Sequence, residues 1–321
     1  MFEEVKDLQA KELILLKELR RICDANNITY FLAYGSLIGA VRHHGFIPWD
    51  DDVDVCMNYP DYMKFKEVCK TQLGSDFFLQ TDETDPNAGL SYFKLRLNNS
   101  TLIIDYLADR DMHHGINIDI YPVYNVPDNG FLRKLQLAAS AVYMLFEAGQ
   151  VLENHGGIMA VGSKFLLKVF RGKARVSLKN KCHRYMAKYE NSHTKQKAML
   201  FGNLNVCKHL YPAETFSKAI KMSFEDGEFS VPIGYDTYLS MFYGDYMKMP
   251  PKEKQGVKLD HIVKISPDEP YEKFKGVLYC VKSSVGGGVL RALNKFHTHL
   301  FQGSVNSIDL AWDCPIGEVC A

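Results

Sequence analysis

The sequence predicts an α/β (α+β) protein: a mixed sheet with flanking helices and a helical insertion. Strand-like runs rich in β-branched and aromatic residues alternate with helical patterns over the first 128 residues. Residues 131–200 are mostly helical in pattern and interrupt the strand-rich part. A chain of 321 residues, 46% of them hydrophobic and 24% charged, is typical of a soluble protein with a substantial core.

The first element expected is an amphipathic helix over 3–25, where apolar residues recur at helical spacing until Asn26 and Asn27 end it. Two shorter helices are expected at 37–44, before Gly45, and at 60–73, where Pro60 suits the first position. The expected strands are 28–34, 53–57, 77–80, 91–97, 101–106 and 116–121, with a further strand-rich stretch at 224–232.

Composition excludes several classes of function. The 38 basic and 38 acidic residues leave no net charge, so a nucleic acid partner is not expected. The eight cysteines are scattered without a CxxC pair, which predicts reduced thiols and no zinc site. Acidic residues near the N-terminus are unlike a secretory signal, so cytoplasmic residence is expected.

The helical stretch leaves membrane contact open. Residues 135–147 are apolar but too short to span a bilayer, and a second segment, 157–170, carries Lys164 and Lys168. We favour two packed helices of an inserted subdomain. The alternative is an amphipathic helix lying on a membrane, which would give peripheral contact at its inner face.

The most informative motif joins a Gly-Ser turn, Gly35-Ser36, to an acidic run that ends in Asp52-Val53-Asp54. On a strand, Asp52 and Asp54 point to one face and Val53 to the other. Two carboxylates held that close repel each other unless a cation lies between them. Mg²⁺ binds oxygen ligands, and a Gly-Ser turn before a helix suits phosphate oxygens. The motif therefore predicts a site for a metal-bound phosphate ester, although a solvated acidic loop is the plainer alternative.

A third carboxylate, Asp119, lies between Ile118 and Ile120 in a strand-like run. Together with Asp52 and Asp54 it resembles the layout of the nucleotidyltransferase superfamily. The first pair would hold Mg²⁺ or Mn²⁺, and Asp119 would complete that site or take the proton from an attacking hydroxyl.

Longer stretches resemble one family within that superfamily. Residues 35–54 (GSLIGAVRHHGFIPWDDDVD) are similar to the signature of the LicD family of phosphocholine transferases, which extends to fukutin and fukutin-related protein. Later family motifs are matched in the same order by 94–96 (KLR), 115–122 (GINIDIYP) and 243–246 (YGDY). The resemblance runs from about Asp7 to His261, and the helical insertion matches by position alone.

The resemblance implies transfer of phosphocholine, or a similar phospho-alcohol, from CDP-choline or another CDP-alcohol, with release of CMP. The acceptor would be a hydroxyl of a lipid-linked glycan or oligosaccharide, such as lipopolysaccharide or teichoic acid. Asp52 and Asp54 would hold the metal, with Asp50 and Asp51 as supporting acids. The domain organisation then expected is 1–128, a nucleotidyltransferase-like catalytic core with the Gly-Ser and DxD motifs; 129–200, the helical insertion; 201–270, the C-terminal part of the core; and 271–321, a C-terminal extension.

Other residues are candidates for contacts with the substrate. Arg42, Lys94 and Arg96 could neutralise phosphate charge, since a loose phosphoryl transition state spreads charge over its oxygens; ordinary salt bridges are the alternative for the last two. Aromatic residues between Tyr235 and Tyr246 recur at helical spacing and favour a core stripe, although one or two could join Trp49 around a quaternary ammonium. The substrate-binding candidates are Gly35, Ser36, Arg42, Trp49, Asp50, Asp51, Lys94, Arg96 and Tyr243.

Two rival functions stay open. A true nucleotidyltransferase would attack the α-phosphorus of an NTP with the same fold and carboxylates. A catalytically idle module would bind nucleotide without turnover.

Overall fold

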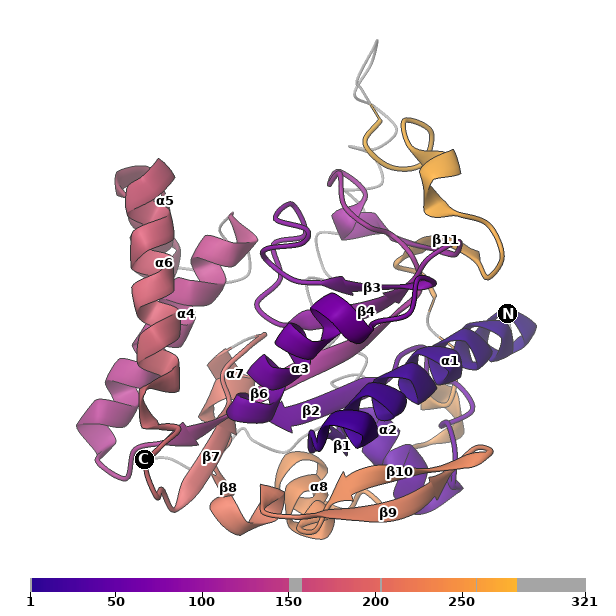
Figure 1. The fold of residues 1–321 in the computed structure, drawn as a ribbon, viewed down its shortest axis with the longest axis horizontal. Coiled ribbons are helices and arrows are strands. Elements are labelled where there is room, and N and C mark those ends of the chain that lie inside the picture. Colours follow the sequence, from indigo (N-terminus) through magenta and orange to yellow (C-terminus); the bar gives the residue numbers. More distant parts are fainter. Residues whose placement is uncertain (1, 150–157, 203, 258, 282–321) are drawn as a thin grey trace.

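The computed structural model describes residues 2–149, 158–202, 204–257 and 259–281. A mixed sheet runs through the molecule with helices around it, which confirms the predicted α/β class (Figure 1). Its central order is β1-β2-β6-β4-β3, and β7 and β8 extend it from β6. The strands are β1 (Phe31–Leu32), β2 (Asp54–Asn58), β3 (Phe77–Gln80), β4 (Phe93–Leu97), β6 (Asn117–Val126), β7 (Gln196–Met199) and β8 (Tyr211–Pro212). β2 and β6 are parallel, and the neighbouring pairs around them are antiparallel.

Two long helices cover one face of this sheet. α1 (Phe2–Asn26) packs beside α3 (Tyr59–Gln72) and against β4 and β6 (Figure 1). The apolar stripe of α1, with Leu8, Leu15 and Leu19, is fully buried, as its helical spacing predicts.

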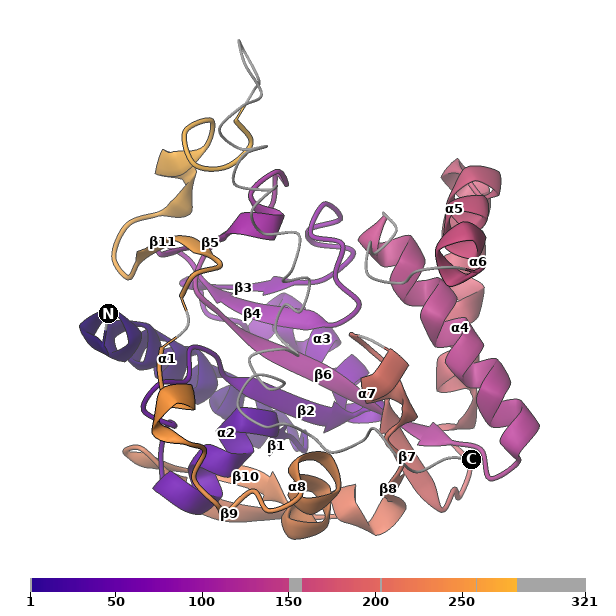
Figure 2. The ribbon, with the colours of Figure 1, turned by 180° about the vertical axis from the view of Figure 1, so that it is seen from behind.

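The edge strand β1 is covered by residues from the C-terminal part of the core. α2 (Tyr34–Ile38) lies near α8 (Tyr235–Tyr243), and the hairpin of β9 (Ala219–Phe224) and β10 (Gly227–Pro232) packs on β1 (Figure 2). Two further strands, β5 (Thr101–Ile104) and β11 (Ile262–Ser266), form a small ladder, and α7 (Leu204–Lys208) precedes β8.

Most expected elements form within two residues of the expected bounds. The strand expected at 116–121 continues to Val126, the stretch expected at 224–232 is part of a hairpin that begins at Ala219, and further differences lie at the Gly-Ser motif. The strand expected at 28–34 shortens to β1, and a helix begins at Tyr34 and continues as a π-helical turn, Gly39–His43. Tyr34 adopts a left-handed φ of 44°, a conformation that strains a bulky side chain. The chain therefore turns sharply from β1 into α2, and Gly35 and Ser36 lie in the first turn of that helix.

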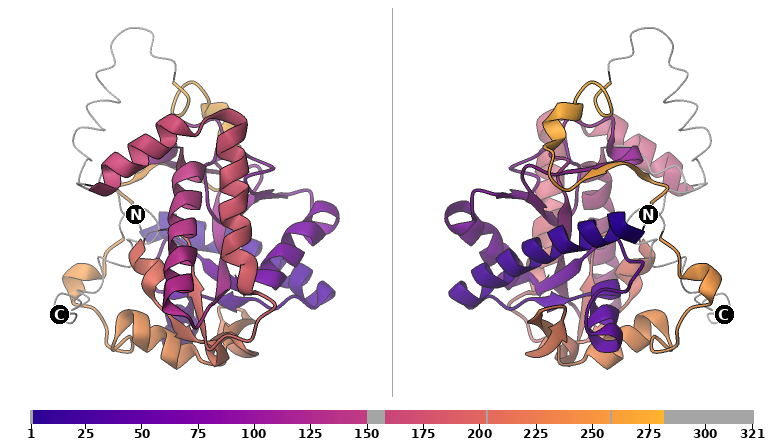
Figure 3. Two further views of the ribbon diagram at one scale, coloured as in Figure 1. Left: turned by 90° about the vertical axis from the view of Figure 1, so that its left-hand side faces the viewer. Right: turned by 90° about the vertical axis from the view of Figure 1, so that its right-hand side faces the viewer.

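The predicted helical stretch contains α4 (Gly130–Ala148), α5 (Ile158–Val169) and α6 (Gly172–Met186). α4 and α6 pack side by side, and α5 crosses above one end of α4 (Figure 3). The expectation was wrong at the end of this stretch, because 196–199 form β7 and pair with β6. No described helix is both long and apolar enough to cross a bilayer. The domain boundaries stay predictions, and residues 282–321 of the expected C-terminal extension lie outside the described ones.

Glu190, at the base of the helical stretch, provides a test of this packing. Its Oε1 accepts a hydrogen bond from the Asn125 backbone N–H, 2.9 Å away, and its Oε2 is buried without a hydrogen-bond partner in the described part of the chain. Burial raises its pKa from 4.5 to about 7. The pKa of Glu190 is higher in the folded than in the unfolded protein. The contribution of Glu190 to the free energy of unfolding is therefore most favourable below about pH 4.5 and is lost as the pH rises to about 7. Glu190→Gln should therefore be more stable than the wild type at pH 8, by up to about 3 kcal/mol, and equal to it at pH 4.

Denaturant unfolding at pH 4, 6 and 8 measures this difference. The exposed Glu253→Gln serves as the matched control, with no pH-dependent gain expected. A gain for Glu190→Gln that is the same at all three pH values would contradict the assignment.

Candidate functional site

Two carboxylates face each other across the pair of parallel strands. Asp54, the first residue of β2, is the register partner of Asp119 on β6, and both are almost fully buried. The Asp119 backbone N–H donates to the Val53 carbonyl, so the pairing continues one residue before β2. Paired residues of adjacent strands point to the same face. The structure thus brings together two carboxylates that are 65 positions apart in sequence.

Asp119 is held by three side chains. Lys94 of β4, its register partner on the other side, places Nζ 2.5 Å from Oδ1. Asn117 Nδ2 donates to the same oxygen at 2.8 Å. The Tyr121 hydroxyl lies 3.1 Å from Asp119 Oδ2 and 2.9 Å from Asp54 Oδ1. One hydroxyl proton cannot serve two carboxylates at once, so a proton or a cation is needed to join this pair.

Sequence reasoning did not single out Asn117 or Tyr121. The alternation around Asp119 could have found them, since residues two apart on a strand share a face.

Arg96 lies two residues after Lys94 on the same strand face, as expected, but its guanidinium is buried. Nε donates to Gln80, and Nη1 donates to the Gly115 carbonyl and to Asn117 Oδ1 at 3.0 Å. Burial lowers its pKa to about 10. A surface salt bridge, the alternative left open for Arg96, is thereby ruled out. The contacts of Arg96 orient the amide that holds Asp119.

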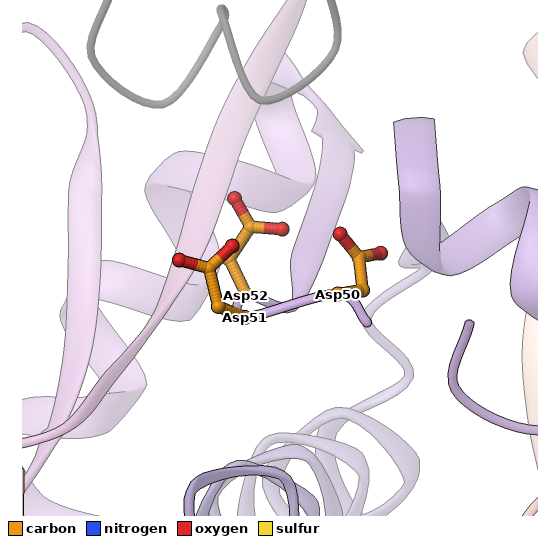
Figure 4. Close-up of side chains that lie close together, drawn as sticks. All are labelled: Asp50, Asp51 and Asp52. Carbon is orange, nitrogen blue, oxygen red and sulfur yellow. The ribbon is translucent and has the colours of Figure 1, made fainter. Parts of the chain in front are cut away.

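The acidic residues 50–52 lie in the segment before β2. Asp52 is therefore not on the strand that begins at Asp54, where it was expected. One oxygen from each of Asp50, Asp51 and Asp52 can be chosen so that all three lie within 4.8 Å of one another. Figure 4 shows the three carboxyl groups on the same side of this segment. Burial and the charges of Asp54, Asp50 and Asp51 raise the pKa of Asp52 well above its usual range. Burial and Asp119 do the same for Asp54.

A further acid comes from α1. Glu12 is 1% exposed, and neither of its carboxylate oxygens has a hydrogen-bond partner among the described residues. One helical turn earlier, Gln9 donates to the carbonyls of Ile47 and Asp50 and so fixes the acidic segment to the helix. Burial, followed by the charges of the acidic segment, raises the pKa of Glu12 well above its usual range. Its place in the sequence, inside an amphipathic helix, gave no signal of this.

Gly35 and Ser36 support the carboxylates directly. A Cβ on Gly35 would lie 2.6 Å from Asp50 Oδ2, so this position admits only glycine without a shift of that side chain. Ser36 Oγ accepts the Asp54 backbone N–H at 2.9 Å. Their predicted contact with phosphate stays a prediction.

Arg42 and Trp49 lie at the rim. Arg42 Nη1 donates to the carbonyls of Tyr246 and Lys248. Burial lowers the pKa of Arg42, and the charge of Asp50 offsets part of this effect. Trp49 is half-buried and meets His43 edge-on. Among the described residues, no ring contact joins Trp49 to the aromatic residues of α8.

The aromatic stripe at 235–246 is part of the core, which confirms the favoured prediction. Tyr238, Tyr243 and Tyr246 are buried, and Phe242 packs on Tyr34. Tyr243 alone of these combines a hydroxyl that has no partner in the described structure with the charges of Asp54, Asp50 and Asp52 acting on it. It therefore lies beside the acidic site.

His261 had no role assigned from sequence. Its Nε2 lies 3.7 Å from Asp51 Oδ2, because the segment before β11 returns to the acidic run. No local pattern could have predicted this contact across 210 residues.

These observations fit a divalent cation. Lys94 is the cation in contact with Asp119, while Asp52, Asp54 and Glu12 form no ion pair with a described basic side chain. Asp54 and Glu12 are buried and Asp52 is half-buried, and carboxylates this close without a counter-charge are costly unless a cation joins them. Carboxylate oxygens are the ligands that Mg²⁺ and Mn²⁺ prefer. The described cysteines are free and contribute no ligand to this site.

A cavity of about 430 Å³ lies elsewhere, lined by residues of α3, α6 and the segment before β4. Phe93 and Tyr124 line this cavity. They lie on the face of the sheet opposite to the acidic residues, because side chains alternate along a strand. It contains none of the predicted site residues.

Comparisons with known proteins agree with the motifs. Residues 27–136 match the family model described as LicD/FKTN/FKRP, nucleotidyltransferase domain. The chain is 26% identical over 260 residues to the lipopolysaccharide cholinephosphotransferase LicD of Haemophilus influenzae, which covers 78% of this chain and 94% of that protein. It is 29% identical over 113 residues to the ribitol 5-phosphate transferase FKRP of Mus musculus, which covers 35% of this chain and 20% of that protein. An uncharacterized protein of Rickettsia typhi is 41% identical over 54 residues, 17% of this chain and 18% of that protein.

Proposed function

We propose that the chain is a member of the LicD family and a phosphotransferase that moves a phospho-alcohol onto a hydroxyl of a glycan. More specifically, we propose phosphocholine as the group, a CDP-alcohol as the donor and CMP as the leaving product. A cell-surface glycan such as lipopolysaccharide or teichoic acid would be the acceptor, met in the cytoplasm. The similarity to the Haemophilus protein over 94% of its length supports phosphocholine over ribitol phosphate.

The observation that carries the proposal is the cluster of buried carboxylates around Asp54 and Asp119. Asp52 and Asp54 would hold Mg²⁺ or Mn²⁺, with Asp119 beside them. When bound, the cation would neutralise the diphosphate of the donor and favour departure of CMP.

The other residues would prepare this site. Lys94 and Asn117 fix the Asp119 carboxylate through Oδ1, and Tyr121 fixes Asp54 through its hydroxyl. Ser36 holds the backbone at Asp54, and Gln9 holds the segment at Asp50. Preorganised charge of this kind lowers a barrier because no groups must reorient during the reaction.

The proposal predicts which bond of the donor breaks. Incubation of the protein with CDP-choline, CDP-ribitol and other CDP-alcohols, in Mg²⁺ or Mn²⁺ and with a glycan acceptor, should release CMP. Label placed in the alcohol should move to the glycan. EDTA should stop the reaction, and added Mg²⁺ or Mn²⁺ should restore it.

The rivals give different products. A nucleotidyltransferase would release pyrophosphate from an NTP and leave CDP-choline intact. An idle module would bind nucleotide and release neither product. Either result would refute the proposed transfer, and tightly bound stoichiometric zinc would contradict the expected metal.

A further inference from the structure

The outermost helix of the insertion exposes an apolar stripe. On α5, Val161, Phe165 and Val169 are 69%, 63% and 54% exposed. They are spaced four residues apart, so they follow one side of the helix. α5 lies at the outer edge of the molecule, away from the main sheet (Figures 1 and 3). The expected packing of two helices therefore does not account for this side of α5, although Phe170 at its end contacts Phe146 of α4.

The same segment concentrates positive charge. Residues 154–189 contain no aspartate or glutamate and carry nine basic residues: Lys164, Lys168, Arg171, Lys173, Arg175, Lys179, Lys181, Arg184 and Lys188. The chain as a whole has no net charge, so its basic residues are strongly segregated here. A charge asymmetry of this kind indicates an anionic partner.

The basic side chains nearest the stripe are free to meet that partner. Lys164 and Lys168 each precede a stripe residue by one position, about 100° around the helix. They are exposed, as are Arg171 and Lys173 at the turn into α6. Within the described part of the chain, none of these four forms an ion pair, whereas Lys179 is held by Asp82 and Glu147.

We propose that α5 docks on a membrane surface that contains anionic phospholipids. Val161, Phe165 and Val169 would enter the boundary between headgroups and acyl chains, and the flanking lysines would reach the headgroup phosphates. An apolar stripe beside unpaired lysines fits this boundary because acyl chains and anionic headgroups meet there, within reach of one helix. Docking would bring the enzyme to a lipid-linked acceptor, and that purpose rests on the proposed function; the membrane contact does not.

Vesicle flotation tests the contact. The full-length protein should float with vesicles of phosphatidylcholine that contain about one-third phosphatidylglycerol, and added salt should release it. Phe165→Ser and the double variant Lys164→Glu/Lys168→Glu should each weaken partitioning by about tenfold or more. Both changes are on exposed positions, so circular dichroism and CMP release should match the wild type.

Matched controls change equally exposed positions elsewhere. Val277→Ser removes an apolar side chain that is 69% exposed, and Lys248→Glu/Lys252→Glu reverses two exposed charges. Both should float like the wild type. The inference would be overturned if the wild type failed to float, if it floated equally with pure phosphatidylcholine, or if the α5 variants floated as well as the controls. A folded protein that floats but releases no CMP would overturn the proposed function and leave the membrane contact standing.

Discussion

Asp54→Asn is expected to lower kcat/KM for phospho-alcohol transfer by roughly 10³-fold or more, because it removes one charge from the proposed cation site. The amide keeps the volume of the side chain and an oxygen that can accept from the Tyr121 hydroxyl. The backbone contact with Ser36 Oγ is unaffected. The loss should therefore come from chemistry and cation binding instead of unfolding.

The stability of Asp54→Asn distinguishes a loss of cation binding from unfolding. Burial and Asp119 raise the pKa of Asp54, so the metal-free wild type holds an unfavourable charge that asparagine lacks. The melting temperature of the metal-free variant should equal or exceed that of the wild type, and the increase caused by Mn²⁺ should shrink. Asp226→Asn is the matched control, since Asp226 is exposed and pairs with Lys17. Activity within tenfold of the wild type at saturating Mn²⁺ would refute the assignment of Asp54.

Lys94→Met is expected to destabilise the fold by about 3–5 kcal/mol, as the loss of one partner of a buried ion pair does. Both partners are shielded, with the side chains of Lys94 and Asp119 6% and 4% exposed. Methionine fills much of the same space but leaves the Asp119 carboxylate beside Asp54 without a counter-charge. Urea unfolding at pH 7 measures the loss.

Two further variants distinguish the loss of the ion pair from a loss of packing. Lys66 is about as buried as Lys94, but its partner Glu83 is 61% exposed, so Lys66→Met should cost far less. Adding Asp119→Asn to Lys94→Met should recover much of the lost stability, because it removes the unpaired charge. If the double variant were as unstable as Lys94→Met, the lysine would be stabilising the core by packing and not by charge.

Much of the site could be predicted from local pattern. The alternation around Asp119 predicts a strand with its carboxylate on one face, and Asp54 begins the neighbouring strand of the same face, since side chains of a strand alternate with a period of two. Asp52, expected on the same strand as Asp54, precedes it. Gly35 and Ser36 stand where a strand turns into a helix, as the change of pattern predicts. The motif over residues 35–54 is long enough to indicate the family by itself.

The sequence pattern was less informative where it was compatible with two different environments of a residue, such as a substrate contact and a buried hydrogen-bond network. Arg96 was a candidate for phosphate, yet it is buried in hydrogen bonds to Gln80, Gly115 and Asn117. The stretch at 196–199 carried no strand signal strong enough to separate it from the helices before it. Pairing with β6 decides its conformation, and that pairing depends on residues far away in sequence.

By itself the sequence determined the α/β class, the alternation of apolar with acidic residues and the resemblance to the LicD family, because each of these depends on periods of a few residues or on a contiguous motif. The tertiary structure decided which side chains meet. It placed Lys94 on Asp119, Glu12 beneath the acidic segment and His261 beside Asp51, and it left the stripe of α5 uncovered. Such contacts join residues tens to hundreds of positions apart, and they follow from how helices and strands pack, which no local pattern encodes.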